Sequence, residues 1–262
     1  MMLAILQARM GSSRLPGKVL MPILGRPMLE LELERLGRAR CLDKIIVATS
    51  DHPADEPIAA LADRLGLECF RGSQDDVLDR YYQAARRWRP RYVARITGDC
   101  PLIDPALVDR LADFFLEGGH DLACNTIRPT FPDGLDAWVM TFEALENAWR
   151  NAVLPSEREH VTQYIQNRPR QFKLGNLEGR PDLSHLRWTV DEPEDLLFAR
   201  QVYQALYPRN PAFTTQDVLD LLAERPALGE INQRFARDEG LLKSLEQDRR
   251  WLDEHATDQP QG

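Results

Sequence analysis

Three cations, two hydroxyls and two glycines lie together in segment 8–18, which reads ARMGSSRLPGK. Glycine lets the backbone come close to a ligand and exposes its N–H groups. Arginine offers phosphate a planar fork of hydrogen-bond donors, and lysine offers a compact positive charge. The segment therefore has the chemistry of a polyphosphate-binding loop. From composition alone, a solvated basic turn is the alternative that stays open.

This loop differs from the two best-known phosphate-binding patterns. Five residues separate Gly11 from Gly17, whereas a Walker A loop has four, and Val19 stands where Ser or Thr would bind magnesium. Ser13 and Arg14 interrupt the glycine spacing of a dinucleotide-binding fingerprint. If the loop binds phosphate, it therefore does so in a way that neither of these patterns describes.

Two aspartates follow segments that read as strands. Asp99 comes directly after YVARIT, and Asp191 comes directly after LRWTV. Ligands of parallel sheets bind beyond the carboxyl ends of the strands, so we expect both carboxylates in one crevice, where they can hold Mg²⁺. Two alternatives stay open. Asp99 could form the turn of Gly-Asp-Cys-Pro, and Asp191 could cap the next helix with Glu194.

The elements that position these residues follow from the hydrophobic pattern. Apolar, β-branched runs predict strands at 3–6, 44–49, 67–70, 92–97, 121–125, 137–140, 172–177 and 186–190. Helical spacing of apolar residues predicts helices at 28–39, 55–65, 75–88, 105–116, 141–150, 157–167, 195–207, 215–224 and 233–254. Asp104 is the expected N-cap of the fourth helix. The alternation implies βαβ units and a mainly parallel sheet flanked by helices, an α/β fold.

Composition limits the function classes. The chain has 262 residues, 43% of them hydrophobic, which suits one α/β domain with an appended subdomain. We expect this domain to span 1–253, in halves of about 1–125 and 126–253, with a disordered tail at 254–262. The net charge of −8 argues against a nucleic-acid partner.

Cysteine usage and the N-terminus predict a cytoplasmic protein. None of the four cysteines forms a Cys-x-x-Cys pair, so a zinc ribbon is not expected. The first cation, Arg9, follows the apolar N-terminal run, whereas a signal peptide has the opposite order. We also expect no membrane span, because no apolar run is long enough.

Segment 4–30 resembles the opening of the cytidylyltransferases that make CMP-activated sugars. CMP-Kdo and CMP-sialic acid synthetases share its A-R-x-x-S-x-R-x-P-G-K character. Nearly end to end, the chain resembles the branch of spore coat polysaccharide biosynthesis cytidylyltransferases. The matching stretches are RGSQDDVLDRYYQA, RITGDCPLIDP, FPDGLD, EREHVTQYI and LSHLRWTVDEPEDL.

The resemblance implies a Rossmann-like fold of the nucleotide-diphospho-sugar transferase type, with a small substrate and dimerisation subdomain in the second half. It also implies transfer of CMP from CTP to a sugar-type acceptor, with release of pyrophosphate, in surface polysaccharide or glycan precursor biosynthesis. Relatives are commonly homodimers, so we expect one here. The acceptor oxygen would attack the α-phosphorus directly, so no covalent enzyme intermediate is needed.

The resemblance also assigns site residues. The implied nucleotide-binding residues are Ala8, Arg9, Met10, Gly11, Ser12, Ser13, Arg14, Lys18, Ser73, Arg80, Thr97 and Asp99. Arg14, Lys18 and Asp99 would act in catalysis, and Asp99 and Asp191 would hold Mg²⁺. The Kdo branch has Gln where this chain has Thr97, so a base contact made by that Gln does not carry over.

Acceptor binding is assigned to Asp133 and Asp136 in PDGLD and to His160 in EREHVT. A Pro-Asp-Gly turn and a structural histidine are the alternatives for these residues. Arg95 lies inside the strand 92–97, and a buried arginine needs a partner such as a phosphate or an acid.

Two rival functions remain. A glycosyltransferase of similar fold would consume a nucleotide sugar, and a nucleotide-binding protein could have kept the fold without the chemistry.

Overall fold

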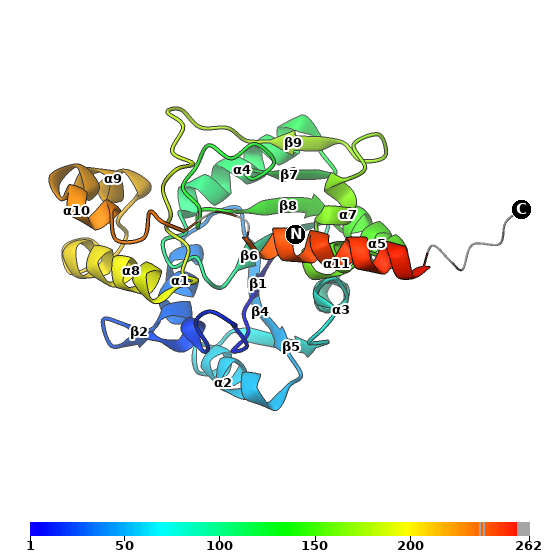
Figure 1. Ribbon diagram of the computed structural model, residues 1–262, viewed down its shortest axis with the longest axis horizontal. Coiled ribbons are helices and arrows are strands. Elements are labelled where there is room, and N and C mark those ends of the chain that lie inside the picture. Colours follow the sequence, from blue (N-terminus) through cyan, green and yellow to red (C-terminus); the bar gives the residue numbers. More distant parts are fainter. Residues whose placement is uncertain (236, 238, 256–262) are drawn as a thin grey trace, which may run out of the picture.

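The computed structural model describes residues 1–235, 237 and 239–255. Within them, seven strands form one sheet in the order β5-β4-β1-β6-β8-β7-β9 (Figure 1). The strands are β1 Met2–Gln7, β4 Lys44–Ser50, β5 Glu68–Gly72, β6 Tyr92–Thr97, β7 Leu122–Cys124, β8 Trp138–Thr141 and β9 Leu174–Asn176.

The sheet is mainly parallel. Strands β5, β4, β1 and β6 pair in parallel, as do β7 and β9. Strand β8 is antiparallel to both of its neighbours, β6 and β7. The predicted α/β fold with a parallel sheet is therefore confirmed, and β8 is its one reversed strand among the described residues.

Helices cover both faces of the sheet because successive side chains of a strand point to opposite sides. Ala4 and Leu6 of β1 pack under α1 (Met28–Leu36), α2 (Glu56–Arg64) and α4 (Pro105–Gly118). On the other face, Leu3 and Ile5 pack against another three helices. These are α3 Val77–Trp88, α5 Phe142–Asn151 and α7 Gln163–Gln166.

A third apolar cluster lies beside the sheet, at the left of Figure 1. Trp188 and Phe198 are buried in its centre. The elements around it are the hairpin β2 Pro22–Ile23 and β3 Arg26–Pro27, with α8 Pro193–Leu206, α9 Thr215–Glu224 and α10 Pro226–Gly229. The remaining elements are the 3-10 turns η1 Lys18–Leu20 and η2 Pro53–Asp55, and the helices α6 Pro155–Glu159 and α11 Glu239–His255.

The predicted helix 157–167 is wrong, because two short helices replace it. Helix α6 ends before His160, and α7 begins only at Gln163. Val161 between them has φ 60, in the left-handed region that β-branched residues rarely adopt. The break keeps Val161 fully buried in the same cluster as Ile165. The apolar spacing therefore continues through the break and hides it.

The predicted strand 186–190 is also wrong. Its only pairing among the described residues is an isolated bridge between Asp133 and Arg187. Trp188 and Val190 are buried against α8 rather than within a sheet. Their apolar pattern reflects burial. From a short apolar run alone, burial against a helix cannot be told from strand formation.

Other boundaries differ less. The hairpin β2–β3 was not predicted, although its turn contains Gly25 at φ 76. The last helix begins at Glu239 rather than 233 and includes residues 254 and 255 of the predicted tail. Residues 236, 238 and 256–262 lie outside the described residues. Asp104 caps α4 as predicted, accepting a hydrogen bond from the N–H of Ala106.

None of the helices described here has the length and apolar character that crossing a membrane requires.

Candidate active site

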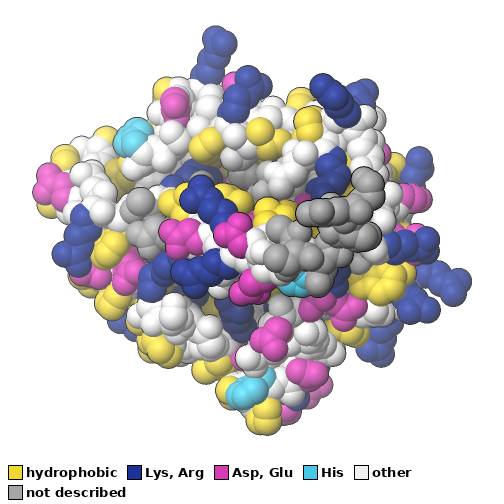
Figure 2. Space-filling view, turned by 45° about the vertical axis from the view of Figure 1, so that its right-hand side comes forward, with side chains coloured by type: hydrophobic (Ala, Val, Ile, Leu, Met, Phe, Trp, Pro, Cys, Tyr) yellow, Lys and Arg dark blue, Asp and Glu magenta, His cyan; other side chains and the backbone are white. Residues whose placement is uncertain are grey.

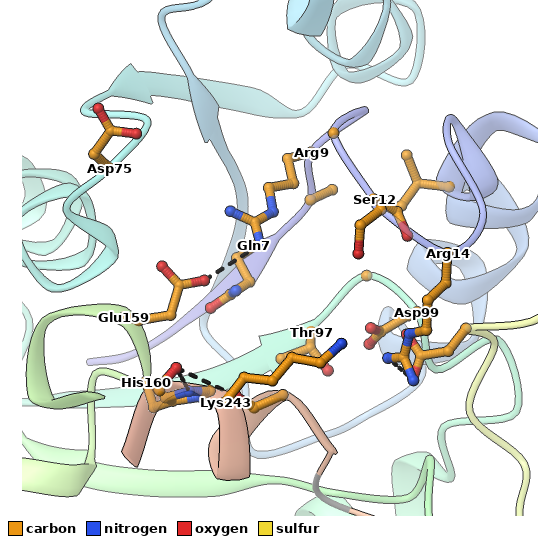
Figure 3. A pocket seen from close by; sticks show the side chains of 18 of the residues that line it. Gln7, Arg9, Ser12, Arg14, Asp75, Thr97, Asp99, Glu159, His160 and Lys243 are labelled. Carbon is orange, nitrogen blue, oxygen red and sulfur yellow. Dashed lines mark hydrogen bonds and ion pairs between the residues drawn. The ribbon is translucent and has the colours of Figure 1, made fainter. Parts of the chain in front are cut away.

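A cavity of about 630 Å³ opens at the carboxyl ends of β1 and β6. Figure 2 shows Lys and Arg side chains, interspersed with acidic ones, across the middle of this face of the molecule. Figure 3 shows side chains from several elements pointing into the cavity. The predicted residues that line it are Ala8, Arg9, Gly11, Ser12, Ser13, Arg14, Lys18, Arg80, Thr97, Asp99, His160 and Asp191.

The loop after β1 is fixed by backbone hydrogen bonds. The carbonyl of Met10 accepts from the N–H groups of Ser12 and Gly17, and Gly17 has φ 72. Asp55 is 3% exposed and accepts the N–H of Met10 at 2.7 Å. The Ser50 hydroxyl donates to the same carboxylate. Burial alone would raise the pKa of Asp55, but these hydrogen bonds outweigh it and lower the pKa.

The turn after β6 needs a residue without a side chain. The N–H of Gly98 donates to the carbonyl of Gln7 at 2.7 Å. A Cβ atom at Gly98 would lie 2.9 Å from that carbonyl oxygen and 3.0 Å from the Cβ of Ala8. Glycine therefore lets Asp99 stand directly beside the loop that follows β1.

Lys18 lies between the two predicted metal ligands. Its ammonium group donates to Asp99 Oδ2 at 2.9 Å, to Asp191 Oδ1 at 2.7 Å and to the carbonyl of Val190 at 2.7 Å. Burial opposes the charge of Lys18, but the two carboxylates outweigh it and raise its pKa. Burial likewise opposes the charge of Asp99, yet Lys18 lowers its pKa to about 2. Lys18 and Asp99 are therefore both charged at neutral pH.

Asp191 reaches this position without the strand that the sequence predicted. The N–H of Val190 donates to the carbonyl of Asp99 at 2.8 Å, which joins the two segments directly. Asp191 does not cap α8, because Glu192 and Asp195 form the capping box. Its carboxylate instead contacts Arg14 at 2.9 Å. The helix-cap alternative for Asp191 is therefore wrong.

Two buried arginines also face the cavity. Arg80 is 1% exposed and Arg95 is 6% exposed. A guanidinium nitrogen of Arg80 donates to the carbonyl of Ser73, and Arg95 lies 4.3 Å above the ring of Trp138. The Nε atom of each arginine has no hydrogen-bond partner among the described residues. Both side chains line the cavity, so each guanidinium group would lie beside an anion bound there.

The predicted acceptor residues line a second cavity, of about 280 Å³, which adjoins the first. Arg95, Asp99 and His160 belong to both. Asp133 pairs with Arg187 at 3.2 Å, and Asp136 pairs with Arg237. Other side chains of this cavity that could hydrogen-bond a hydroxylated ligand include those of Thr97, Thr126, Thr162, Gln163, Gln166 and Thr189.

His160 is held as a neutral side chain. Its Nε2 lies 2.9 Å from the hydroxyl of Ser244 on α11. Burial, followed by the positive charge of Arg95, lowers the pKa of His160 to about 4. Cys100, which contacts Asp99, is fully buried, and burial followed by the negative charge of Asp99 raises the pKa of its thiol well above the usual range. It therefore stays protonated and is no nucleophile at neutral pH.

Two predicted nucleotide-binding residues are not among those that line the cavity. Met10 shapes the loop through its backbone, and Ser73 accepts hydrogen bonds from Asp76 and Arg80. Sequence reasoning missed other lining residues. These are Gln7, Val19, Asp75, Gly98, Pro155, Arg158, Glu159, Gly240, Lys243, Ser244 and Gln247. The stretch EREHVTQYI could have indicated Arg158 and Glu159, whereas α11 carries no motif.

Glu32 on α1 was also missed. It is fully buried, and its carboxylate accepts the N–H of Cys100 at 3.3 Å. Burial, followed by the negative charge of Asp99, raises the pKa of Glu32 well above its ordinary value. Through this hydrogen bond Glu32 supports the turn that holds Asp99. It stands among the apolar residues of α1, where no sequence pattern marks it.

Comparisons with known proteins show what the whole chain is similar to. A family described as "Cytidylyltransferase" matches residues 3–208. The spore coat polysaccharide biosynthesis protein SpsF of Bacillus subtilis is 33% identical over 86% of this chain and 95% of its own. A solved cytidylyltransferase from Leptospira borgpetersenii superposes with a TM-score of 0.84 at 31% identity, covering 90% of this chain and 99% of that one. The CMP:2-keto-3-deoxy-manno-octonic acid synthetase complexed with CTP shares the fold, with a TM-score of 0.59 at 19% identity over 78% of this chain and 98% of its own.

Proposed function

This chain belongs to the cytidylyltransferase family, and we propose that it transfers CMP from CTP to a sugar-type acceptor with release of pyrophosphate. We place this reaction in the biosynthesis of surface polysaccharides or glycan precursors. The similarity to SpsF, a spore coat polysaccharide biosynthesis protein, supports that assignment. The shared fold of the synthetase that binds CTP supports the choice of nucleotide.

The observation that carries the proposal is the set of cations around one pair of carboxylates. Arg14 and Lys18 both contact Asp191, and Lys18 also contacts Asp99. Arg9 and Arg80 line the same cavity. A triphosphate carries more negative charge than the diphosphate of a nucleotide sugar, and several cations within reach of one loop suit it better. This density favours a nucleotidyltransferase over a glycosyltransferase of similar fold.

The chemistry needs positioning and charge neutralisation. A bond forms between an acceptor oxygen and the α-phosphorus, while the bond from that phosphorus to the pyrophosphate oxygen breaks. Negative charge grows on the departing pyrophosphate, and Arg14 and Lys18 stand where they can neutralise it. The buried arginines orient the substrate by donating to its oxygens. No covalent enzyme intermediate is required, which agrees with the protonated thiol of Cys100.

The donor set fits Mg²⁺, which prefers oxygen ligands and is often bound by one or two carboxylates plus substrate phosphates. The Oδ1 atom of Asp99 accepts a long contact of 3.6 Å from the thiol of Cys100, a weak donor, and so can take a metal. We propose Asp191 as the second ligand. It would give up its contacts with Lys18 and Arg14 when it binds the metal. Bound Mg²⁺ would stabilise negative charge on the transferred phosphoryl group and the leaving group.

The second cavity is the proposed acceptor site. It adjoins the nucleotide cavity at Asp99 and Arg95, so an acceptor there would meet the nucleotide beside the catalytic groups. Hydroxyl and amide side chains line it, together with the indole of Trp138. Such walls suit a sugar, whose hydroxyls need donors and acceptors and whose ring carbons pack on an aromatic face. The expected homodimer stays a prediction.

The test is pyrophosphate release in a matrix of the four nucleoside triphosphates against acidic keto-sugars and neutral sugars, with and without MgCl₂. We expect release only with CTP, an acceptor and the metal. In the Asp99→Asn variant, release should fall to background while the thermal unfolding temperature is retained. Consumption of a nucleotide sugar without pyrophosphate would identify a glycosyltransferase. CTP binding without turnover of any acceptor would identify a nucleotide-binding protein.

A further inference from the structure

Helix α11 contributes a wall of the nucleotide cavity. It lies beyond residues 3–208, where the family match ends. Gly240, Lys243, Ser244 and Gln247 line the first cavity. Figure 3 shows the Lys243 side chain extending from α11 across the cavity, toward the side where Ser12, Thr97 and Asp99 lie. Helix α11, the last of the described helices, thus faces the loop that follows β1.

Helix α11 is docked on α6 by buried polar contacts. The carboxylate of Asp248 is 5% exposed and accepts from the N–H of Ser156 at 2.8 Å and from its hydroxyl at 2.5 Å. One turn earlier, Ser244 is 6% exposed and contacts His160. Positions four apart lie on one helix face, so both contacts hold the same side of α11 against the protein. That orientation fixes where Lys243 points.

Lys243 differs from the other cations of the cavity. Lys18 and Arg14 contact Asp191, and Arg9 pairs with Glu159 at 3.3 Å. For Lys243, the part of the chain that the structure describes supplies neither a hydrogen bond nor an ion pair. Two buried arginines, Arg80 and Arg95, line the same cavity. The cavity therefore holds more positive charge than its own carboxylates neutralise.

The position of Lys243 distinguishes between the two cavities. Lys243, Ser244 and Gln247 line the first, where the glycine-containing loop lies, but not the second, which Asp133 and Asp136 line. We infer that Lys243 binds the polyphosphate of the nucleotide, and that α11, held by Asp248, positions it. The identity of the nucleotide in this inference rests on the proposed function. The negative charge of the group that Lys243 binds follows from the cavity alone.

The test measures binding of inorganic tripolyphosphate by calorimetry to the full-length protein at low salt. We expect Lys243→Gln to weaken binding by about tenfold, as the loss of a charge-assisted phosphate contact does. Arg249→Gln is the matched control, because Arg249 is an exposed cation of the same helix outside both cavities. The control should bind within about twofold of the unmodified protein. Equal affinities for Lys243→Gln and the unmodified protein would overturn the inference.

A double-mutant cycle tests the positioning role of α11. Asp248→Ala should weaken tripolyphosphate binding severalfold, and Lys243→Gln should add little in that background, because residues that act through one contact are not additive. Full additivity would contradict positioning by Asp248. If Asp248→Ala unfolds, Ser156→Ala, which removes the hydroxyl contact alone, replaces it. Tripolyphosphate binding that depends on Lys243, without pyrophosphate release from any triphosphate, would support this inference while refuting the proposed reaction.

Discussion

Lys18 is a buried cation whose hydrogen-bonding capacity is fully satisfied by its neighbours. Its ammonium group is buried, and two carboxylates and a carbonyl accept its three hydrogen bonds. Desolvation of such a group is unfavourable unless partners satisfy it. These partners keep the ammonium group of Lys18 charged and immobile, beside the space where a phosphate would lie. Arg14 pairs with Asp191 as well, and with the neighbouring Glu192.

Removing either cation should slow the reaction. We expect Lys18→Met and Arg14→Ala each to lower kcat for pyrophosphate release by at least about tenfold, because charge stabilisation of the leaving group is lost. Arg40→Ala is the control, since Arg40 is an exposed cation that pairs with Asp109 and lines neither cavity. Near-normal kcat in both variants would remove the loop from the mechanism.

His160 should make stability depend on pH. Its pKa is lowered to about 4 in the folded protein, from the ordinary 6.5, by burial and by the charge of Arg95, and Asp248 opposes this only in part. The unfolded chain therefore binds more protons between these values, so the free energy of unfolding falls as pH drops through that window. We expect a loss of about 1–2 kcal/mol between pH 7 and pH 5.

Urea unfolding of the protein and of His160→Gln measures this effect. Between pH 7 and pH 5, the variant should not lose the part of the unfolding free energy that comes from His160, because glutamine does not titrate. Parallel curves for the two proteins from pH 7 to pH 5 would show that His160 is not buried as a neutral group.

At the scale of elements, the loop after β1 depends on a residue that precedes α2. Asp55 accepts hydrogen bonds from Met10 on the loop and from Ser50 at the end of β4. The sequence predicts Asp55 only as the start of a helix. Its link to the loop joins residues 45 positions apart, and no local pattern encodes that.

Asp55→Ala should release the loop as well as destabilise the protein. We expect a loss of roughly 2–3 kcal/mol in unfolding free energy, from buried donors left without an acceptor. We also expect a rise in the KM for CTP, because the loop is no longer preorganised. Asp51→Ala, an exposed neighbour, is the control for both measurements. An unchanged KM in a destabilised Asp55→Ala protein would show that the anchor serves stability alone.

Local pattern predicted most elements of the first half. The bounds of β6 are those expected, and the βαβ order from β1 to α4 follows from the alternation of apolar runs. The failures, at 157–167 and 186–190, have one cause. Apolar residues there are buried by distant partners, and burial leaves the same spacing as a helix or a strand.

Site residues could be predicted only where a motif marks them. Glu32 and Lys243 lie on amphipathic helices, where a single charged residue carries no signal.

At the scale of the molecule, substrate should bind elements from both ends of the chain. We expect CTP at 100 times its Kd to stabilise the protein by about 2.7 kcal/mol. Hydrogen exchange should slow at once in segment 8–18 and in α11, because both line one cavity. Helix α9, which faces the separate apolar cluster, is the internal control. Protection of the loop without α11 would mean that α11 is not part of the binding site.

The order of the elements has a consequence for biosynthesis. Every described strand of the sheet and the loop after β1 precede α11 in the sequence, and a ribosome makes the chain in that order. A chain that stops before α11 would therefore contain all of these strands but lack one wall of the first cavity.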